Sequence, residues 1–426
     1  MRHRLRRPLV ATFLVAPLLV VLIGCGTDAE SPPDDGGAAP PSDTACPGDV
    51  GDALAAWGAA GFSGSVVLTT DGAPVCEAAF GLADQDEERP NTVDTVFSIG
   101  SVSKAVTAAA VFALVDDGQL RLDQTAGEVL PELEGAAAAV TIEQLLLHTS
   151  GLQGGHGQDH EPLSRDDAIA AISGLESAFP PGTDSLYSNA GYTLLALVAE
   201  EASGRPYRDL IAERLLALPD GSTAGGFWDG EPAAPGPRAV GYHDDGAPGA
   251  DGSFAGPHWA LAGNGDVAMT MPQLAAWTHA LFTGELLSAD STEAVARPEV
   301  DTGDGTAEAP GWVVFDEERF GEPVVASAGG GGDVGHEVVV AWLPDSERVF
   351  TIASNTPDVT AEALLEAIGP ALASGDPLPR PDVPVDDAST PAERAVAAGT
   401  YVLDDGGRIV VADEDGSLHA SADGVD

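Results

Sequence analysis

The stretch Phe97-Ser-Ile-Gly-Ser-Val-Ser-Lys104 contains the only lysine of this 426-residue chain, whose other permanently cationic side chains are all arginine. Arginine stays charged at any useful pH, whereas a buried lysine can change its pKa and exchange protons. Ser101 lies three residues before Lys104, and residues 105–115 contain no Gly or Pro, which is typical of a buried helix. The spacing predicts that the Ser101 hydroxyl and the Lys104 amine share one face at the N-terminal end of that helix.

A serine beside an amine at a helix N-terminus has the groups that nucleophilic catalysis requires. An alkoxide that develops on Ser101 would meet the Lys104 amine and the positive end of the helix dipole. The alternative is a capping serine and a solvated lysine, because serine and lysine also occur at this spacing by chance. The retention of a single lysine and the motifs described below favour the catalytic interpretation.

Composition and charge limit the classes of protein to consider. A length of 426 residues with 44% hydrophobic content supports a large core, in one large domain or two modest ones. The formal net charge of -50 excludes nucleic acid and anionic lipid headgroups as favourable partners, because an acidic surface repels both. We attribute this charge to solubility and environment rather than to mechanism.

Residues 1–24 have the organisation of an export signal. Four arginines within the first seven residues precede an apolar run at 9–23, and a glycine then precedes Cys25. The pattern resembles a bacterial lipoprotein signal, which predicts a lipid anchor on Cys25 and a location at the extracytoplasmic face of the cell membrane. The alternative is a plain secretory signal with an incidental cysteine. The Pro- and Gly-rich residues 25–46 are predicted to be a disordered tether.

The two remaining cysteines, Cys46 and Cys76, form an even pair in a chain that carries an export signal. Such a pair predicts a disulfide that joins the start of the folded domain to its first hairpin. The alternative is two buried free thiols. Neither cysteine has another Cys or a His at metal-ligand spacing, so the sequence predicts no metal site, and no cofactor is predicted either.

Strand patterns lie at both ends of the folded region, on either side of a long Ala- and Leu-rich helical middle. The first two strands form a predicted hairpin, and the last is followed by an amphipathic helix; the strands are 63–70, 74–80, 310–315, 337–342 and 348–353, and the helix is 360–368. This order predicts one sheet assembled from distant segments, with a helical domain inserted between its strands. We expect the functional site in the cleft between these layers.

Motifs that follow one another in a fixed order give the chain a resemblance to a known group of enzymes. The stretch ending in Lys104 is followed by Leu146-Leu-His-Thr-Ser-Gly-Leu152, by Phe179-Pro-Pro-Gly-Thr183 and by Tyr187-Ser-Asn-Ala-Gly-Tyr192. Together they resemble the serine β-lactamase and penicillin-binding-protein superfamily, in particular its branch of class C β-lactamases, D,D-peptidases and esterases. The resemblance extends from about Gly61 to Ser374.

This resemblance implies an α/β fold in which an antiparallel β-sheet is flanked by N- and C-terminal helices and carries an inserted all-helical domain. It places the serine hydrolase domain at residues 47–375. It implies further that Ser101 is the catalytic nucleophile, that Lys104 is its proton partner, and that Tyr187 and Asn189 line the site.

Tyr187 fits the role of a base partner. A phenol with an ordinary pKa of about 10 acts as a base near neutral pH only where cations favour its anion. We predict that Lys104 does this and that the two residues share one mobile proton. The alternative is an aromatic side chain whose hydroxyl is merely satisfied. Asn189 would bind Lys104 or a substrate amide, or else belong to a turn.

Three histidines receive structural interpretations. His148 precedes Thr-Ser-Gly, a predicted helix end, and we predict that it caps this end. His156 and His160 lie in a Gly-rich loop and are predicted to be exposed; the alternative is that this loop borders the cleft. His148 is not predicted to act as a base.

The third motif of the superfamily, a lysine or histidine followed by a small residue and a glycine, is altered in this chain. Counting back from Gly335 along the stretch 326–335 places Gly329 at the position of the basic residue. The resemblance then implies that the cation that binds a substrate carboxylate in β-lactamases and D,D-peptidases is missing. His336 is the alternative source of positive charge.

The glycines of this stretch still offer bare backbone to a substrate. Gly330, Gly331 and Gly332 are therefore predicted to bind substrate. The amides of Ser101 and Gly332 are predicted to form the oxyanion hole, which contributes much of the electrostatic stabilisation in acyl transfer. These donors do not depend on the missing cation.

The composition changes after residue 375. Residues 376–395 are Pro-rich and predicted to be a linker, and residues 398–411 have a strand–turn–strand pattern. Residues 396–426 resemble the opening of a small C-terminal β-barrel that some esterase and peptidase relatives carry. They are too few to complete one.

These observations predict an extracytoplasmic serine hydrolase that forms an acyl-enzyme on Ser101. Esterase-like activity on a small ester or amide without a required carboxylate fits best. A β-lactamase or D-alanyl-D-alanine carboxypeptidase, acting on a β-lactam or a peptidoglycan-derived peptide, is the second enzymatic interpretation. A catalytically impaired binding or scaffolding lipoprotein is the alternative from a different class.

Overall fold

The computed structural model describes residues 44–252, 258–303 and 305–381, together with the strands at 399–402, 408–414 and 417–423. The described residues between 44 and 381 form one compact unit, and the three C-terminal strands belong to another. The predicted export signal, the predicted lipid anchor on Cys25 and most of the predicted tether and linker lie outside the described residues. Within the described part of the chain, no helix combines the length and the apolar character that crossing a membrane requires.

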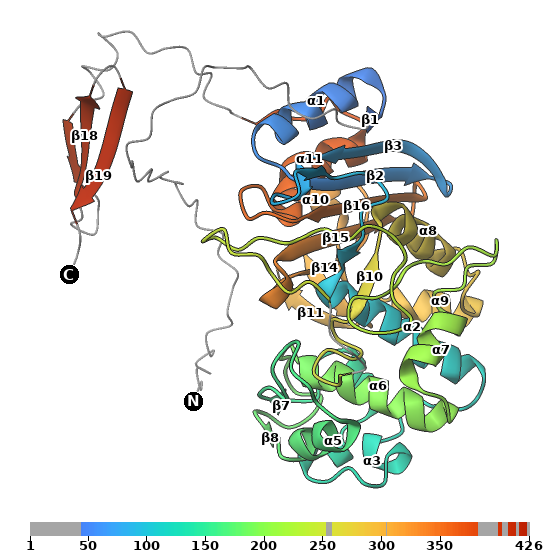
Figure 1. The fold of residues 1–426 in the computed structure, drawn as a ribbon. Coiled ribbons are helices and arrows are strands. Elements are labelled where there is room, and N and C mark those ends of the chain that lie inside the picture. Colours follow the sequence, from blue (N-terminus) through green and yellow to red (C-terminus); the bar gives the residue numbers. More distant parts are fainter. Residues whose placement is uncertain are drawn as a thin grey trace, which may run out of the picture. The chain divides into compact units, whose positions relative to one another are not determined.

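A nine-stranded antiparallel sheet forms the centre of the larger unit (Figure 1). Its order is β1-β3-β2-β16-β15-β14-β13-β12-β11. The strands are β1 (Thr44–Ala45), β2 (Gly64–Thr70), β3 (Ala73–Phe80), β11 (Val300–Gly303), β12 (Thr306–Ala309), β13 (Trp312–Phe315), β14 (Val324–Gly331), β15 (His336–Leu343) and β16 (Arg348–Ser354). Strand β2 from the N-terminal hairpin pairs with β16 from the far end of the unit, which confirms the prediction of one sheet built from distant segments.

Helices cover both faces of this sheet because its strands alternate apolar side chains between them. Val66 and Leu68 of β2 face α1 (Gly48–Ala59) and α11 (Ala361–Ser374), whereas Val67 faces the core that contains α2 (Ser103–Asp116) and α8 (Met271–Phe282) (Figure 1). Helix α11 begins at the N-cap Thr360 and ends at Gly375 in a left-handed conformation, as its sequence favours. The predicted flanking by N- and C-terminal helices is confirmed.

The segment between α2 and α8 forms the predicted insertion. Its helices are α3 (Ala126–Val129), α4 (Ile142–Leu146), α5 (Arg165–Ser173), α6 (Asn189–Ser203) and α7 (Tyr207–Arg214). The insertion is not all-helical as expected: its described residues also include a two-residue ladder between β7 (Leu152–Gln153) and β8 (Glu176–Ser177), part of a second sheet, and long irregular stretches between α7 and β10. In that sheet β10 (Val267–Met269) pairs with β6 (Phe97–Ser98) and with β9 (Gly226–Phe227), so the insertion is tied to the strand that leads into Ser101.

The shorter elements connect this framework. They are β4 (Leu82–Asp84), β5 (Arg89–Pro90), the 3-10 helices η2 (Ala136–Ala139) and η3 (Gly332–Val334), and the helices α9 (Ala289–Val295) and α10 (Glu317–Phe320). A disulfide joins Cys46, beside β1, to Cys76 of β3, as the even cysteine count predicted. The bond holds the start of the unit to its first hairpin.

The C-terminal strands form a small antiparallel sheet of their own. Its order is β17 (Gly399–Val402), β18 (Arg408–Glu414) and β19 (Ser417–Asp423). The strand–turn–strand predicted at 398–411 corresponds to β17 and the first half of β18. Strand β19 extends that hairpin by one strand.

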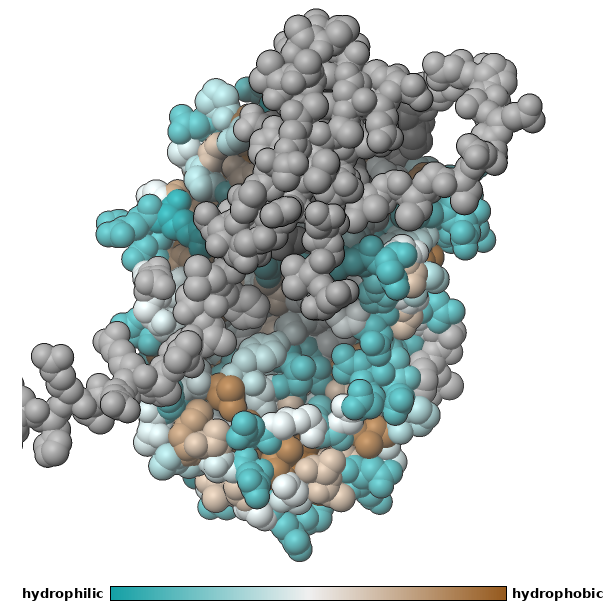
Figure 2. Space-filling model, turned by 90° about the vertical axis from the view of Figure 1, so that its left-hand side faces the viewer, coloured by the Kyte–Doolittle hydropathy of each residue, from teal (hydrophilic) through white to brown (hydrophobic). Residues whose placement is uncertain are grey.

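The surface is predominantly polar. On the face shown in Figure 2, hydrophilic side chains outnumber hydrophobic ones among the coloured residues, and the hydrophobic ones form small separate groups. This distribution agrees with a sequence of 68 acidic and 18 basic residues. A highly charged surface of one sign favours solubility.

Candidate active site

Ser101 lies at the start of the central helix. It occupies the single turn of the 3-10 helix η1 (Gly100–Val102), which leads directly into α2. Val102 is fully buried and anchors the turn in the core. Gly100 has a φ of +50°, which L side chains rarely adopt, and its Cα passes close to the backbone of β14. The sequence Gly-Ser-Val therefore fixes the serine at the junction of the sheet and the helix.

The structure brings Ser101, Lys104 and Tyr187 together. The Lys104 amine donates to Ser101 Oγ at 3.0 Å, and the Tyr187 hydroxyl donates to the same oxygen at 2.6 Å. The amine also donates to the backbone carbonyl of Asn264 at 3.0 Å, and it lies 4.7 Å from the centre of the Tyr187 ring. The three predicted catalytic groups thus meet at one oxygen atom.

Burial controls the charge of Lys104. Its side chain is only 3% exposed, and burial lowers the pKa of its amine to about 7, against an opposing effect of the Asp159 carboxylate. The contacts with Ser101 and Asn264 are made to uncharged groups, which offset little of the desolvation of an ammonium ion. A substantial fraction of Lys104 is therefore neutral near pH 7 and able to accept a proton.

Tyr187 differs from its predicted role as the anionic base. Tyr187 as a whole is 55% exposed, but its hydroxyl points inward to Ser101. Burial of that hydroxyl raises the pKa of Tyr187, the hydrogen bond with Ser101 opposes the rise, and the Glu308 carboxylate adds to it. Lys104 does not lower this pKa, because an amine with a pKa of about 7 has already lost its charge at the alkaline pH where a phenol ionises. The phenol remains a proton donor, and Lys104 is the better base.

His148 positions Tyr187. It is buried, and its Nδ1 accepts from the backbone N–H of Ser188 at 3.1 Å while its ring lies 4.6 Å from that of Tyr187. Burial, together with the charge of Lys104, lowers the pKa of His148 to about 3, so the ring is neutral. The prediction that His148 has a structural role is therefore correct. The residue supports the segment that carries Tyr187 as well as the end of α4.

The predicted register of the third motif is wrong by two residues. A Cβ on Gly329 would lie 2.3 Å from the Ser101 nitrogen and 2.4 Å from the Ile99 carbonyl oxygen, so no side chain fits there. Because side chains alternate along a strand, the next residue on the same face toward the N-terminus is Ser327. Ser327 is buried and lines a recess of about 180 Å³ together with Ser101, Lys104 and Tyr187. Ser327, not Gly329, thus occupies the place from which a basic side chain could reach the site.

His336 does not supply the missing charge. It is 3% exposed, its Nδ1 accepts from the backbone N–H of Ser98 at 3.1 Å, and its ring packs against Phe97 and Trp228. Burial lowers its pKa to about 3. The histidine is therefore a neutral packing residue at the wall of the site.

A cavity of about 410 Å³ opens in front of Ser101. Two carboxylates, Asp159 and Asp333, lie in its lining, and no lysine or arginine from the described residues does. The cavity also contains the predicted Asn189, Gly330 and Gly332. Asn189 is exposed at the start of α6, and the hydrogen bonds of Lys104 within the described structure go to other residues.

Glu308 is a site residue that the sequence reasoning missed. It extends from β12 into the smaller recess beside Ser101, Lys104 and Tyr187, and burial raises its pKa to about 7. Its strand was not among the predicted ones, and no local motif marks it. Ser327 could have been found, because strand alternation from Gly329 identifies it.

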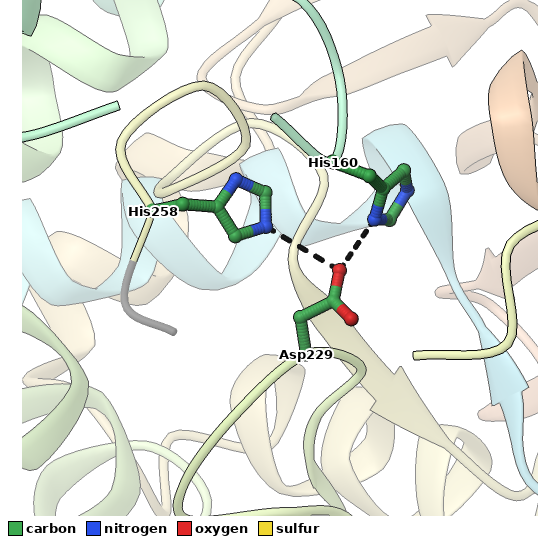
Figure 3. Close-up of side chains that lie close together, drawn as sticks. All are labelled: His160, Asp229 and His258. Carbon is green, nitrogen blue, oxygen red and sulfur yellow. Dashed lines mark hydrogen bonds and ion pairs between the residues drawn. The ribbon is translucent and has the colours of Figure 1, made fainter. Parts of the chain in front are cut away.

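The prediction that His156 and His160 are exposed is wrong. His156 is buried, with Nε2 3.0 Å from the Trp259 carbonyl oxygen, and the His160 side chain is 11% exposed and bonded to Asp229 (Figure 3). The loop folds inward because these side chains find polar partners contributed by residues that lie far away in sequence. Local composition does not reveal such contacts.

Comparison with known proteins supports the fold and the class of enzyme. A family model described as Beta-lactamase matches residues 53–373. The chain belongs to the Beta-lactamase family. The predicted superfamily is therefore confirmed, and the chain is a serine hydrolase of this family.

Relatives within the Beta-lactamase family have different activities in their names. Penicillin-binding protein 4* of Bacillus subtilis (strain 168) is 27% identical over 389 residues, which cover 84% of this chain and 83% of that protein. Esterase EstB of Burkholderia gladioli is 33% identical over 198 residues, 42% of this chain and 49% of the esterase. The chain thus spans about half the length of the esterase.

A solved structure shows the same fold. The penicillin binding protein from Bacillus halodurans has a TM-score of 0.59 and 23% identity, with 71% of this chain and 95% of that chain covered. At this level of identity the likeness concerns the fold alone. It confirms the mixed α/β architecture with a large antiparallel sheet.

Proposed function

We propose that this serine hydrolase forms an acyl-enzyme on Ser101 with esters or amides that carry no carboxylate beside the scissile bond. Esterase-type activity is its main activity in this proposal. The observation that carries the proposal is the charge of the cavity. Asp159 and Asp333 lie in its lining, and the neutral Ser327 stands where a basic side chain could reach the substrate. An anionic ligand would approach two carboxylates without a dedicated cation to bind it.

Two histidines, His160 and His336, are among the described residues that line this cavity, and only the pKa of His160 is raised. Burial alone would lower its pKa, but the hydrogen bond with Asp229 and the carboxylates of Asp159 and Asp333 raise it above its usual value. Any positive charge on the ring is paired with the Asp229 carboxylate. The ring contributes little free positive charge for a substrate.

The hydrogen bonds around Ser101 define a proton route. Neutral Lys104 accepts the hydroxyl proton while Oγ bonds to the substrate carbonyl carbon, which forms a tetrahedral intermediate. As the bond to the leaving group breaks, the Tyr187 hydroxyl donates its proton to that group, and the Lys104 ammonium replaces it. Water then hydrolyses the acyl-enzyme by the same steps in reverse.

The position of Gly329 in β14 also changes which backbone amide is expected to complete the oxyanion hole. Gly329 packs against the Ser101 amide, so the strand amide that follows this contact belongs to Gly330 rather than to the predicted Gly332. Gly330 lines the same cavity as Ser101. We therefore place the oxyanion between the Ser101 and Gly330 amides.

The test compares acylation of one protein by two kinds of substrate. The chain is incubated with a fluorophosphonate and, separately, with a penicillin, and intact mass is measured; Ser101→Ala serves as the control. Modification by the fluorophosphonate and slow or absent acylation by penicillin support the proposal. Acylation by penicillin as fast as by a neutral p-nitrophenyl ester would favour the β-lactamase or D,D-peptidase alternative, and no adduct with either would favour a binding lipoprotein.

A charge placed at Ser327 should shift this preference. A charge-assisted hydrogen bond to a ligand carboxylate contributes about 1.5–3 kcal/mol, or about ten- to a hundredfold. Ser327→Lys should raise acylation by penicillin relative to a neutral ester by up to that factor, measured as a ratio of second-order constants. Ser222→Lys is the control, because Ser222 is exposed and lines neither of the two cavities beside Ser101. Equal ratios in both variants would refute the assignment of Ser327.

The location of the protein is a separate proposal. The N-terminal sequence supports export and a lipid anchor on Cys25 at the extracytoplasmic face of the membrane. In the natural host, Cys25→Ala should release the protein from the membrane fraction. Retention of the variant there would contradict the anchor.

A further inference from the structure

His160, Asp229 and His258 form a buried cluster beside the catalytic cavity. They come from three separate segments: the loop before α5, the segment after β9, and the segment before β10 (Figure 3). The side chains are 11%, 3% and 2% exposed, and one ligand atom from each lies within 4.8 Å of the others. Figure 3 shows both imidazole rings directed at one carboxylate oxygen of Asp229. Three distant parts of the chain thus converge on one small volume.

The donor atoms suit a divalent transition metal. Two imidazole nitrogens and a carboxylate oxygen are ligands that zinc takes, whereas magnesium and calcium prefer oxygen alone. His258 Nε2 lies 3.3 Å from Asp229 Oδ2. This is longer than the roughly 2.7–2.9 Å of a charge-assisted hydrogen bond. It equals the separation of about 3.3 Å between neighbouring ligands of a tetrahedral ion with bonds of about 2.0 Å.

The third ligand atom needs a small adjustment. His160 Nδ1 is within hydrogen-bond distance of the same Asp229 oxygen, so the ring must withdraw slightly for an ion to enter. His160 lies on a loop and has a φ of +56°, a conformation that residues other than glycine rarely adopt. Such backbone conformations persist where surrounding structure holds them, often at functional sites. The ring can move outward because it borders the cavity in front of Ser101.

The surroundings favour a cation. Asp159 and Asp333 border the same cavity as His160, and both carboxylates act electrostatically on its ring. The buried Arg208 directs one nitrogen to the Asp229 backbone carbonyl and another toward the Asp266 carboxylate at 3.4 Å, so its charge is paired with a carboxylate outside the cluster. Asp229 within the cluster and Asp159 and Asp333 beside it are the carboxylates that act on the His160 ring.

We propose that His160 Nδ1, Asp229 Oδ2 and His258 Nε2 bind one divalent transition-metal ion of the zinc type, with water completing its coordination. The ion would fix the His160 loop to the segments that carry Asp229 and His258. It would also place positive charge behind the wall of the catalytic cavity. The site does not require Ser101 chemistry and would exist whatever ester or amide the enzyme cleaves.

The experiment measures metal binding directly. The protein is dialysed against a chelator and then titrated with Zn²⁺ and with Co²⁺, in high salt and with excess Mg²⁺, because an acidic surface binds cations weakly everywhere. We expect one Zn²⁺ per chain by elemental analysis, a higher thermal midpoint on binding, and visible absorption of four-coordinate Co²⁺. Binding should weaken as the pH falls, because protons compete for both histidines.

Single substitutions distinguish this site from scattered surface binding. Loss of a residue that only supports a metal ligand typically weakens metal binding by about 10- to 100-fold. His160→Ala removes a ligand itself, so it should weaken Zn²⁺ binding by more than this and should remove the Co²⁺ absorption bands. His243→Ala, which changes a histidine outside the cluster, and Ser101→Ala should keep wild-type affinity. No stoichiometric uptake by the wild type, or equal affinity in His160→Ala and His243→Ala, would overturn the proposal. The three residues would then be a hydrogen-bonded bridge only.

Discussion

At the residue scale, the chemistry of the site depends on the environment of one lysine. Lys104 lies under Tyr187, and the hydrogen-bond acceptors of its amine are a hydroxyl and a backbone carbonyl. Such partners leave the ammonium form poorly stabilised, and the amine loses its proton at unusually low pH. An arginine here would remain charged. This requirement explains why a chain that otherwise uses arginine retains one lysine.

The pH dependence of hydrolysis should report this amine. With a pKa of about 7, Lys104 is protonated and unable to accept the Ser101 proton at lower pH. We expect kcat/KM for a neutral ester to rise about tenfold per pH unit below 7 and to level off above it. A pH–rate profile measured with Lys104→Arg as the inactive control checks this. A profile without a break near 7 would assign the general base to another group.

The same burial should make stability depend on pH. Lys104 has a lower pKa in the folded protein than the 10.5 of the unfolded chain, so its burial is most destabilising below about pH 7, where both states are protonated. Above pH 7 the folded state loses the proton first, and the penalty falls by about 1.4 kcal/mol per pH unit. Lys104→Met should therefore stabilise the protein more at pH 6 than at pH 9 in urea unfolding. Ser101→Ala, which keeps the amine buried, should show no such difference; an equal effect of Lys104→Met at both pH values would contradict the argument.

Residue assignments were predictable where they rest on local spacing. Local spacing placed Ser101 and Lys104 on one helix turn, whereas Tyr187 was assigned from the family resemblance of its motif; the structure brings the three side chains together. The register at Gly329 and the inward fold of His160 depend on backbone contacts between segments far apart in the chain. No local pattern encodes those contacts, and both predictions failed.

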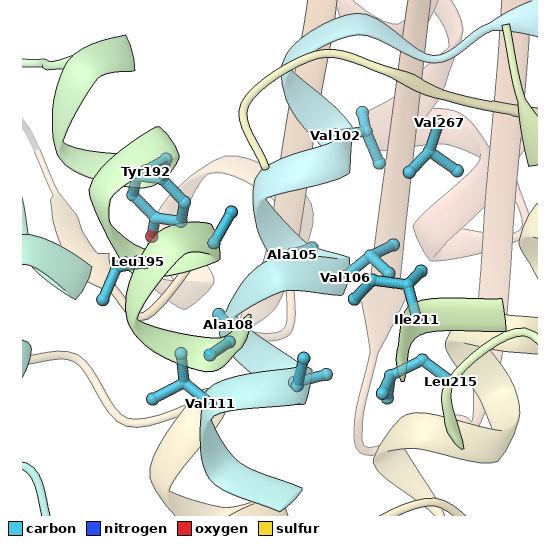
Figure 4. Packing of buried hydrophobic residues seen from close by; sticks show 14 of the residues in the cluster. Val102, Ala105, Val106, Ala108, Val111, Tyr192, Leu195, Ile211, Leu215 and Val267 are labelled. Atoms are coloured by element: carbon cyan, nitrogen blue, oxygen red, sulfur yellow. The ribbon is translucent and has the colours of Figure 1, made fainter. Parts of the chain in front are cut away.

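At the scale of elements, α2 is the feature that positions the site. It is buried all round, with Val106 and Val111 among its large side chains and alanines between them (Figure 4). The alanines let α6 approach, and Tyr192 of that helix packs beside α2. Helix α2 contacts α6, α7 and α9, and the 3-10 turn η1 that precedes it contacts β14 and β15. Ser101, which lies in η1, is therefore held between the sheet and the helical insertion. The absence of Gly and Pro predicted this helix correctly, but not which helices surround it.

The disulfide should stabilise the edge of the sheet without affecting catalysis. Cys46 and Cys76 are separated by 30 residues, and closing a loop of this length contributes about 3–4 kcal/mol in the chain-entropy model. Cys46→Ser combined with Cys76→Ser should lower the free energy of unfolding by about that amount, measured by denaturant titration. The kcat for a neutral ester should stay within about twofold of wild type at a temperature where the variant is folded. Unchanged stability would show that the bond constrains nothing in solution.

At the scale of the whole molecule, two properties of the sequence have consequences that no single element shows. Strand patterns at both ends of the domain indicated one sheet, and the structure confirms it. The order of the nine strands was not predictable, because the outer strands β11 and β12 carry few apolar side chains.

The second property is the excess of acidic residues, which acts through long-range repulsion rather than through contacts.

Added salt should stabilise this protein. At low ionic strength a formal net charge of -50 repels itself across the folded surface, and screening shortens that repulsion from about 30 Å at 0.01 M to about 3 Å at 1 M salt. We expect the thermal midpoint to rise by several degrees with NaCl over this range. KCl should act equally, since the effect depends on ionic strength. A midpoint that is flat or falls with either salt would show that the carboxylates are already paired or well separated.

The pairing of β2 with β16 determines when the protein can fold. During synthesis Gly64–Thr70 emerges early and pairs with β3 on one side, but its other partner, Arg348–Ser354, follows only after residues 71–347. At about 5–20 residues per second, the open edge waits for tens of seconds. Until then the edge of β2 that pairs with β16 has no partner, and an unpaired strand edge invites association with other chains. The central sheet is therefore completed only after its last strand has been synthesised.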